Sequence, residues 1–220
     1  MARSFGSRIL PSCLLAGALL ASAAAVLHPT LAGDGAAQLA TIAASAHWRA
    51  IHWAFLFGFP LSLAGLAGLA AEQAGTPGER AARAGVVVAT FGYACWAVIV
   101  AFMVGTGWTL ARHIATAASG ADADAAIFLF AMVQPFALAT QRVAGWALGV
   151  ATALLGWGMT SGKVLPRWLG CAGIAAGVAA MALALAFGET TRADQAAFVL
   201  PVLWQLATGA LLLGRRSAAS

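Results

Sequence analysis

Four histidines, at positions 28, 47, 52 and 113, are the residues of this 220-residue chain best suited to chemistry. Imidazole nitrogens bind transition metals and haem iron, and they exchange protons near neutral pH. Each of them borders an apolar stretch: His28 ends the first, His47 and His52 open the second, and His113 follows the third. If these stretches cross a membrane alternately, all four imidazoles lie at the same face of it.

The spacing of these histidines decides how they could share a ligand. His47 and His52 are five residues apart, which on a helix turns them about 140° from each other, so one helix cannot chelate with both. A haem or transition-metal site would need different helices, for example His52 with His113, with His28 and His47 as further metal ligands. No carboxylate adjoins them to orient the rings, as metal sites commonly require. The alternative is that they anchor the chain at the interface.

Other chemistry has weaker support in the sequence. The chain contains no Gly-x-Ser-x-Gly, His-Glu-x-x-His or phosphate-binding glycine loop, and its three cysteines form no Cys-x-x-Cys pair. Polar residues deep in the apolar stretches are few, mainly Thr90, Tyr93, Gln134 and Gln205, and no Asp, Glu, Lys or Arg lies near the expected middle of the bilayer. Ion-coupled transporters usually place a charged group there. We therefore expect no catalytic residues.

The composition indicates a membrane protein. Hydrophobic residues make up 62% of the chain and charged residues 9%, whereas soluble domains are about 25% charged. The net charge of +5 is more informative about topology than about nucleic acid, because no basic run with interleaved aromatic residues is present. The expected surroundings are a lipid bilayer, with a membrane-protein partner or further copies of the chain as candidate partners.

Apolar stretches long enough to cross a bilayer predict an all-α polytopic transmembrane bundle of six spans, at about 9–27, 50–71, 84–110, 143–162, 168–188 and 195–214. A seventh span at 125–141 is the alternative. With six spans and both termini in the cytoplasm, eight of the 12 basic residues lie inside; with seven, six lie on each side. Basic residues favour the cytoplasmic side, so we predict six spans.

Two segments allow more than one interpretation. Pro135 interrupts residues 124–141 and removes a backbone donor, so we predict a kinked segment in the outer leaflet that is either broken from the next span or tilted with it. Residues 1–27 resemble a secretory signal, whose cleavage would leave five spans. We favour a retained helix, because its apolar run of 19 residues is longer than a typical signal core.

Local motifs refine the boundaries. Thr76, Pro77 and Glu79 form a capping-box pattern, with Thr76 as the cap of the third span and Pro77 as its first residue. The Gly145-x-x-x-Gly149 and Gly173-x-x-x-Gly177 pairs permit close contact between helices. We expect packing within one chain rather than a dimer motif.

The turn at 158–177 carries a family resemblance. Its sequence Leu165-Pro166-Arg167-Trp168-Leu169-Gly170, with the glycines that follow it, resembles a pattern in uncharacterised bacterial six-span membrane proteins, a domain family of unknown function. The resemblance implies the six-span fold and the bacterial plasma membrane. It implies no activity and says nothing of the histidines.

These observations favour a non-catalytic protein that binds a partner or a small apolar ligand within the membrane. The first alternative is a redox protein with a histidine-ligated haem or metal. It is suggested by the expected position of all four histidines at one face of the membrane. The second is a small transporter, which the uncharged interior of the spans disfavours.

Overall fold

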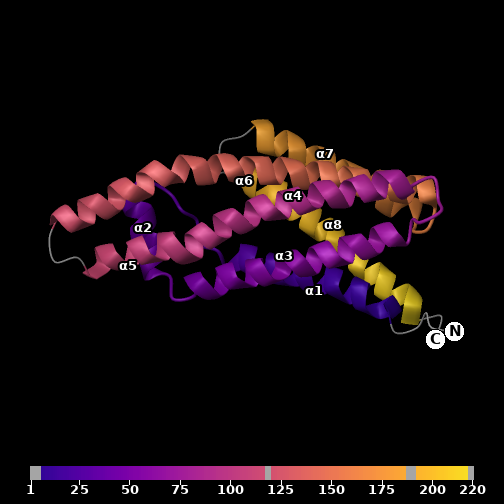
Figure 1. The fold of residues 1–220 in the computed structure, drawn as a ribbon, viewed down its shortest axis with the longest axis horizontal. Coiled ribbons are helices and arrows are strands. Elements are labelled where there is room, and N and C mark those ends of the chain that lie inside the picture. The colour runs from indigo at the N-terminus through magenta and orange to yellow at the C-terminus, as the bar shows by residue number, and fades with distance from the viewer. Residues whose placement is uncertain (1–5, 117–119, 187–191, 218–220) are drawn as a thin grey trace.

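The computed structural model describes residues 6–116, 120–186 and 192–217, and all secondary structure in these ranges is helical. The elements are α1 (Gly6–Leu27), α2 (Gly35–Ala44), α3 (Trp48–Ala71), α4 (Glu79–Phe102), the π-helix η1 (Met103–Gly107), α5 (Trp108–Thr116), α6 (Gly120–Gly162), α7 (Arg167–Ala186) and α8 (Arg192–Ser217). Figure 1 shows them as an elongated bundle of long helices, with the short α2 near one end.

The described residues contain six helices that are long and apolar enough to cross a membrane. They are α1, α3, the continuous run that α4, η1 and α5 form together, α6, α7 and α8. Their number equals the number of spans that the sequence predicts. The predicted span 84–110 extends to Thr116 through η1. The last two residues of the predicted span 168–188 lie outside the described part of the chain.

Residues 124–141 do not form a separate segment. They belong to α6, an unbroken helix of 43 residues with Pro135 inside it. Of the two predicted alternatives, broken from the next span or tilted with it, the continuous helix rules out the first. At 1.5 Å per residue α6 is about 65 Å long, twice the thickness of a hydrocarbon core. Ile127 and Phe130 pack in a hydrophobic cluster with residues of α2 and α5, and this packing supports the helix on the N-terminal side of the proline.

The six long helices pack as a closed ring in chain order. Each contacts the next along the sequence, from α1 through α3, α4, α6 and α7 to α8, and α8 packs back on α1. The helix α1 is therefore part of the bundle and has two neighbours. Beside α1, a methyl group added to Gly58 would lie 3.0 Å from the carbonyl oxygen of Gly17, so α1 and α3 approach to backbone contact.

Glycines likewise bring α6 and α7 into backbone contact. A methyl group added to Gly149 would lie 2.8 Å from the carbonyl oxygen of Gly177. Gly145 is less crowded, because its added methyl group would meet only the Ala184 side chain, at 3.6 Å. Gly149 and Gly177 thus pack within one chain, as predicted, whereas a methyl group added to Gly173 would meet the Trp204 side chain of α8 at 2.6 Å.

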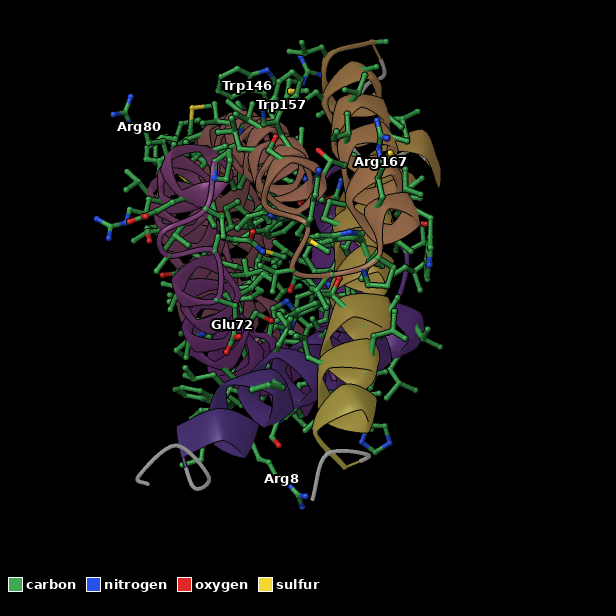
Figure 2. The ribbon with its side chains drawn as sticks, turned by 90° about the vertical axis from the view of Figure 1, so that its right-hand side faces the viewer. Arg8, Glu72, Arg80, Trp146, Trp157 and Arg167 are labelled. Atoms are coloured by element: carbon green, nitrogen blue, oxygen red, sulfur yellow. The ribbon has the colours of Figure 1, made fainter. Side chains whose placement is uncertain are left out.

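Short turns and basic side chains gather at one end of the bundle. The start of α1, the end of α8, the α3–α4 turn and the α6–α7 turn all lie there (Figure 1). Figure 2 views this end and shows Arg8, Arg80 and Arg167 at the rim of the bundle. Lys163, in the α6–α7 turn, has a positive φ of 57°, the left-handed conformation that often ends helices.

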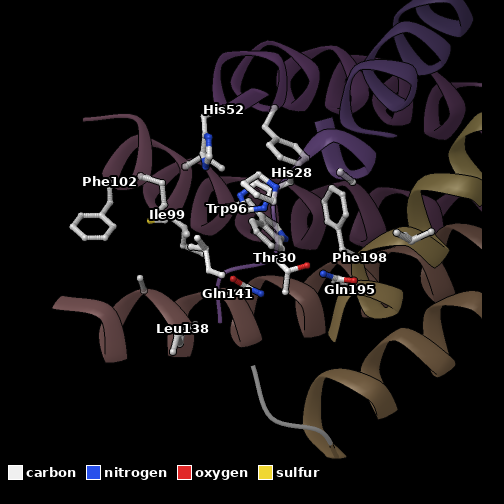
Figure 3. Close-up of a pocket in the computed structure, with 18 of the residues that line it drawn as sticks. His28, Thr30, His52, Trp96, Ile99, Phe102, Leu138, Gln141, Gln195 and Phe198 are labelled. Carbon is white, nitrogen blue, oxygen red and sulfur yellow. The ribbon is translucent and has the colours of Figure 1, made fainter. Parts of the chain in front are cut away.

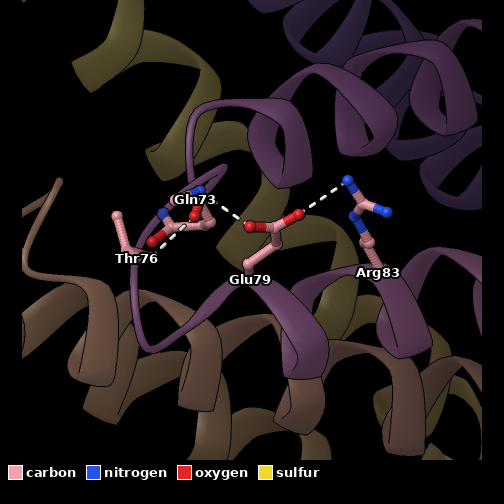
Figure 4. Close-up of polar contacts among 5 residues, drawn as sticks. Gln73, Thr76, Glu79 and Arg83 are labelled. Atoms are coloured by element: carbon pink, nitrogen blue, oxygen red, sulfur yellow. Dashed lines mark hydrogen bonds and ion pairs between the residues drawn. The ribbon is translucent and has the colours of Figure 1, made fainter.

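The α3–α4 turn differs from the predicted capping box. The helix α4 begins at Glu79, with Gly78 rather than Thr76 at the cap position. Glu79 Oε2 accepts a hydrogen bond of 2.7 Å from the Gly75 backbone, and Thr76 Oγ1 donates one of 2.7 Å to the carbonyl oxygen of Gln73 (Figure 4). Pro77 therefore lies in the turn, before the helix. The glutamate still reaches back, but to a residue one position before the threonine.

The opposite end of the bundle has a second hydrophobic core. Leu39 and Ile42 of α2 pack with Trp48, Ala111 of α5 and Phe130 of α6 in one cluster. Asp34 caps α2 by accepting a hydrogen bond of 2.9 Å from the Ala37 backbone. Because α2 has only 10 residues, it is too short to span a bilayer. It packs across α5 and α6 and supports the wall of the site described next.

Candidate functional site

A cavity of about 370 Å³ lies at this second end of the bundle, between α1, α3, α4, α6 and α8 (Figure 3). Residues 28–31, which follow α1, Gln38 of α2 and Met103, which begins η1, complete its wall. The described residues that line it include no Asp, Glu, Lys or Arg. A charged ligand would lose its hydration in such a cavity without gaining an ionic partner, so the lining favours an uncharged one.

Aromatic rings make up much of the cavity wall. Phe198 of α8 contacts Trp96 of α4 and Phe55 of α3, with ring centroids 5.1 and 5.8 Å away. Phe102 and Phe130 stack at 6.2 Å where α4 meets α6, and both rings line the cavity. Flat, apolar faces of this kind suit a planar ligand body.

Two of the four histidines meet in this cavity. The His28 and His52 ring centroids are 5.2 Å apart, and each ring also packs against Trp48, at 5.1 and 4.2 Å. His52 is 2% exposed and Trp48 is fully buried. The first turn of α3 brings Trp48 and His52 together, because residues four apart lie on the same face of a helix. Burial lowers the pKa of His28 from its usual value, which favours the neutral ring.

Backbone hydrogen bonds orient the imidazoles. His52 Nδ1 lies 2.7 Å from the carbonyl oxygen of Trp48. A carbonyl oxygen can only accept, so Nδ1 carries the hydrogen and, in the neutral ring, Nε2 is an acceptor. His28 bonds the backbone of Pro29, and since proline has no N–H, His28 must be the donor there as well. Each neutral imidazole therefore keeps one nitrogen as an acceptor.

The π-helix η1 contributes to the same arrangement. Trp48 Nε1 donates a hydrogen bond of 3.0 Å to the carbonyl oxygen of Met103, the first residue of η1. Carbonyl oxygens inside an α-helix normally accept hydrogen bonds from backbone N–H groups of the same helix. π-Helical turns often mark functional positions. This contact joins α3 to the end of α4 and holds the Trp48 ring against both histidines.

Glutamine side chains line the α6 side of the cavity. Gln134 Nε2 donates to Gln38 Oε1, and Gln38 Nε2 donates a hydrogen bond of 2.9 Å to the carbonyl oxygen of Gly33. Gln141 and Gln195 also reach the wall. The sequence identified Gln134 as a polar residue deep in an apolar stretch, but it did not identify the other three. Only the folded chain joins Gln38 to a residue 96 positions away.

Trp96 presents an indole donor with no acceptor. Its Nε1 is buried and has no hydrogen-bond partner in the described part of the chain, while its ring lines the cavity. An unsatisfied buried N–H costs about 1–3 kcal/mol, so a ligand oxygen that reached this nitrogen would be stabilised. The sequence carried no signal for this role, because tryptophan is common throughout membrane proteins.

The other two histidines lie outside the cavity. His47, just before α3, and His113, in α5, are both exposed, and neither lines the wall. The ring beside His52 is that of His28 rather than His113. Among the described residues no group of three or more His, Cys, Asp or Glu side chains converges, so the four histidines do not form one ligand set.

Comparisons with known proteins leave this geometry as the main guide to function. No protein-family model, curated protein or solved structure matches the chain.

Proposed function

We propose that the six helices cross a bacterial plasma membrane, with both termini in the cytoplasm. The end of the bundle that carries Arg8, Arg80 and Arg167 supports this orientation, because basic residues favour the cytoplasmic side. Exposed apolar side chains along the helices, such as Phe57 and Phe91 at 61% and 54%, suit a lipid-facing surface. A periplasmic reporter fused after Arg192 should be active and one fused after Lys163 silent; the reverse pattern would refute the orientation.

Within this membrane setting, the function that the site supports best is non-catalytic binding of a small, uncharged and largely apolar ligand. The observation behind it is the cavity of about 370 Å³, with an aromatic and aliphatic wall and no charged residue among its described lining. Its volume is near the lower end of the range for ligand sites, about 300–1,000 Å³. A compact ring system or the head of a lipid fits this volume better than a whole lipid does.

The test uses a cavity-filling substitution with a matched control. Ala137 on α6 is buried and lines the cavity, whereas Ala139, two residues on, is exposed. Ala137→Phe should fill the cavity, and Ala139→Phe should add the same ring to the outside of the helix. Radiolabelled methylnaphthalene is bound to protein in lipid nanodiscs, and the signal of empty nanodiscs is subtracted.

We expect saturable binding to the wild type and to Ala139→Phe, and loss of binding in Ala137→Phe. Val202→Trp, which enters the same cavity from α8, replaces Ala137→Phe if that variant fails to fold, as judged by helical circular dichroism and gel filtration. Equal binding to all folded variants would show that the probe associates elsewhere, and the proposal would be wrong.

The second candidate function is transition-metal binding by His28 and His52. The 5.2 Å separation of their rings and the acceptor nitrogen that each keeps favour it. Zinc sites use three or four protein ligands, so a metal here would need ligands from outside the described chain. Metal analysis and absorption spectra of protein from a metal-replete, haem-sufficient host test this candidate. A stoichiometric metal or haem that is lost in His28→Phe would support it, and metal-free, colourless protein would refute it.

A further inference from the structure

Among the described residues, no hydrogen bond reaches the acceptor nitrogen of His28 or His52. Each neutral ring already gives its single N–H to a backbone carbonyl oxygen, at Pro29 and Trp48, so neither imidazole can donate to the other. Their ring centroids are 5.2 Å apart. One hydrogen-bond donor placed beside the pair could reach either of them.

The amides of Gln134 and Gln38 donate to other acceptors. Gln134 Nε2 donates to Gln38, and Gln38 Nε2 donates to the carbonyl oxygen of Gly33. Trp96 has the opposite need, because its buried Nε1 is a donor without an acceptor. The cavity therefore offers acceptors at the histidines and an unused donor at Trp96, within an uncharged wall that also carries amide and hydroxyl groups.

We propose that the ligand carries a hydroxyl group, which donates its hydrogen to the imidazole of His52 or His28. This inference rests on the proposed function and adds the polar chemistry of the ligand to it. A hydroxyl group matches both needs of the site, since its hydrogen bonds an imidazole nitrogen and its oxygen has lone pairs for the indole N–H of Trp96. The expected class is a neutral, planar lipophilic alcohol or phenol.

Three probes of similar size separate the possible roles of the polar group. Methylnaphthalene has no polar group, methoxynaphthalene can only accept a hydrogen bond, and naphthol can both donate and accept. Binding of each radiolabelled probe is measured in nanodiscs, as above, at pH 7.5. A net neutral hydrogen bond changes affinity by about three- to tenfold. We expect wild-type protein to bind naphthol more tightly than methoxynaphthalene by about this factor.

The variants assign that preference to the histidines. His52→Phe and His28→Phe keep an aromatic ring and remove the acceptor nitrogen. At least one of them should lose the preference for naphthol over methoxynaphthalene while keeping its affinity for methylnaphthalene. His113→Phe is the matched control, because His113 is exposed on α5 and should keep the preference. If His52→Phe does not fold, His28→Phe, at the less buried ring, decides the result.

The outcomes distinguish this inference from the proposed function. If methylnaphthalene binds in the cavity but naphthol and methoxynaphthalene bind equally, the hydroxyl inference is wrong and the apolar site stands. The same holds if the preference for naphthol persists in both folded histidine variants. If methylnaphthalene and naphthol both fail to bind, or bind to Ala137→Phe as to the wild type, the proposed function itself fails.

Discussion

The contact between α6 and α7 provides the sharpest test of the packing. Gly145 and Gly149 are both buried and lie one helical turn apart on α6, facing α7. An added methyl group at Gly149 would lie 2.8 Å from the carbonyl oxygen of Gly177 and 3.0 Å from the backbone nitrogen of Met181. At Gly145 the nearest atom would be the Ala184 side chain, at 3.6 Å. We therefore expect Gly149→Ala to destabilise the protein and Gly145→Ala not to.

The magnitude follows from the comparison of the two variants. Both substitutions remove a helical glycine, which favours the helix by up to about 1 kcal/mol in each case, so this effect cancels in the difference. Gly149→Ala additionally forces a backbone carbonyl away by roughly 0.6 Å before ordinary contact is reached, and overpacking of this kind costs about 1–3 kcal/mol. We expect Gly149→Ala to be less stable than Gly145→Ala by about that amount.

The assay is reversible unfolding in mixed micelles of dodecylmaltoside and increasing dodecyl sulfate, followed by far-ultraviolet circular dichroism. The midpoint of Gly145→Ala should match or exceed that of the wild type, and that of Gly149→Ala should be lower. Equal stability of the two variants would refute the reasoning, because it would mean that α6 and α7 do not approach to backbone contact at this point.

Three further predictions use the same unfolding assay. Lys163→Gly should stabilise the protein by about 0.5–1 kcal/mol, because Lys163 has a φ of 57°; an unchanged midpoint would contradict the left-handed turn. Tyr93→Phe should cost about 0.5–2 kcal/mol, since the Tyr93 hydroxyl donates a buried hydrogen bond of 3.0 Å to Gln205; the double variant with Gln205→Met should lose less than the two single losses combined. Burial lowers the pKa of His28 below its usual 6.5, so only the unfolded chain takes up this proton as the pH falls below that value. The unfolding free energy should then fall between pH 7 and 5 by more in the wild type than in His28→Gln, and parallel pH profiles would contradict the burial of this ring.

Part of the candidate site was predictable from the sequence. The position of all four histidines beside apolar stretches singled them out, and the structure brings His28 and His52 together. The structure adds Trp48 as the neighbour that both rings share. The sequence suggested His52 with His113 as an example, whereas the structure pairs His52 with His28. The helices α1 and α3 pack side by side, which places His28, just after α1, next to the first turn of α3. Spacing along the sequence contains no information about this packing.

The long helix α6 shows how packing decides between alternatives that a local rule leaves open. Pro135 predicted a break or a tilt because it removes a backbone hydrogen bond. The loss of one such bond is offset when side chains on both sides of the proline pack against neighbours. Phe130 packs before Pro135 in the cluster with α2 and α5, and Ala137 after it is buried. Those neighbours come from other parts of the chain, so the proline by itself could not decide the outcome.

The sequence by itself determined the helical class, the number of long apolar helices and the glycine positions where helices meet closely. These properties depend on hydropathy and residue size summed along short windows, which need no knowledge of a partner helix. Only the tertiary structure decided which faces of the helices point inward, and with them the cavity, the His28–His52 pair and the unpartnered indole of Trp96. The physical reason is that lipid and a neighbouring helix accept an apolar side chain almost equally well. Periodicity therefore does not reveal the inward face of a uniformly apolar helix, and the rotation of each helix emerges only when all six pack together.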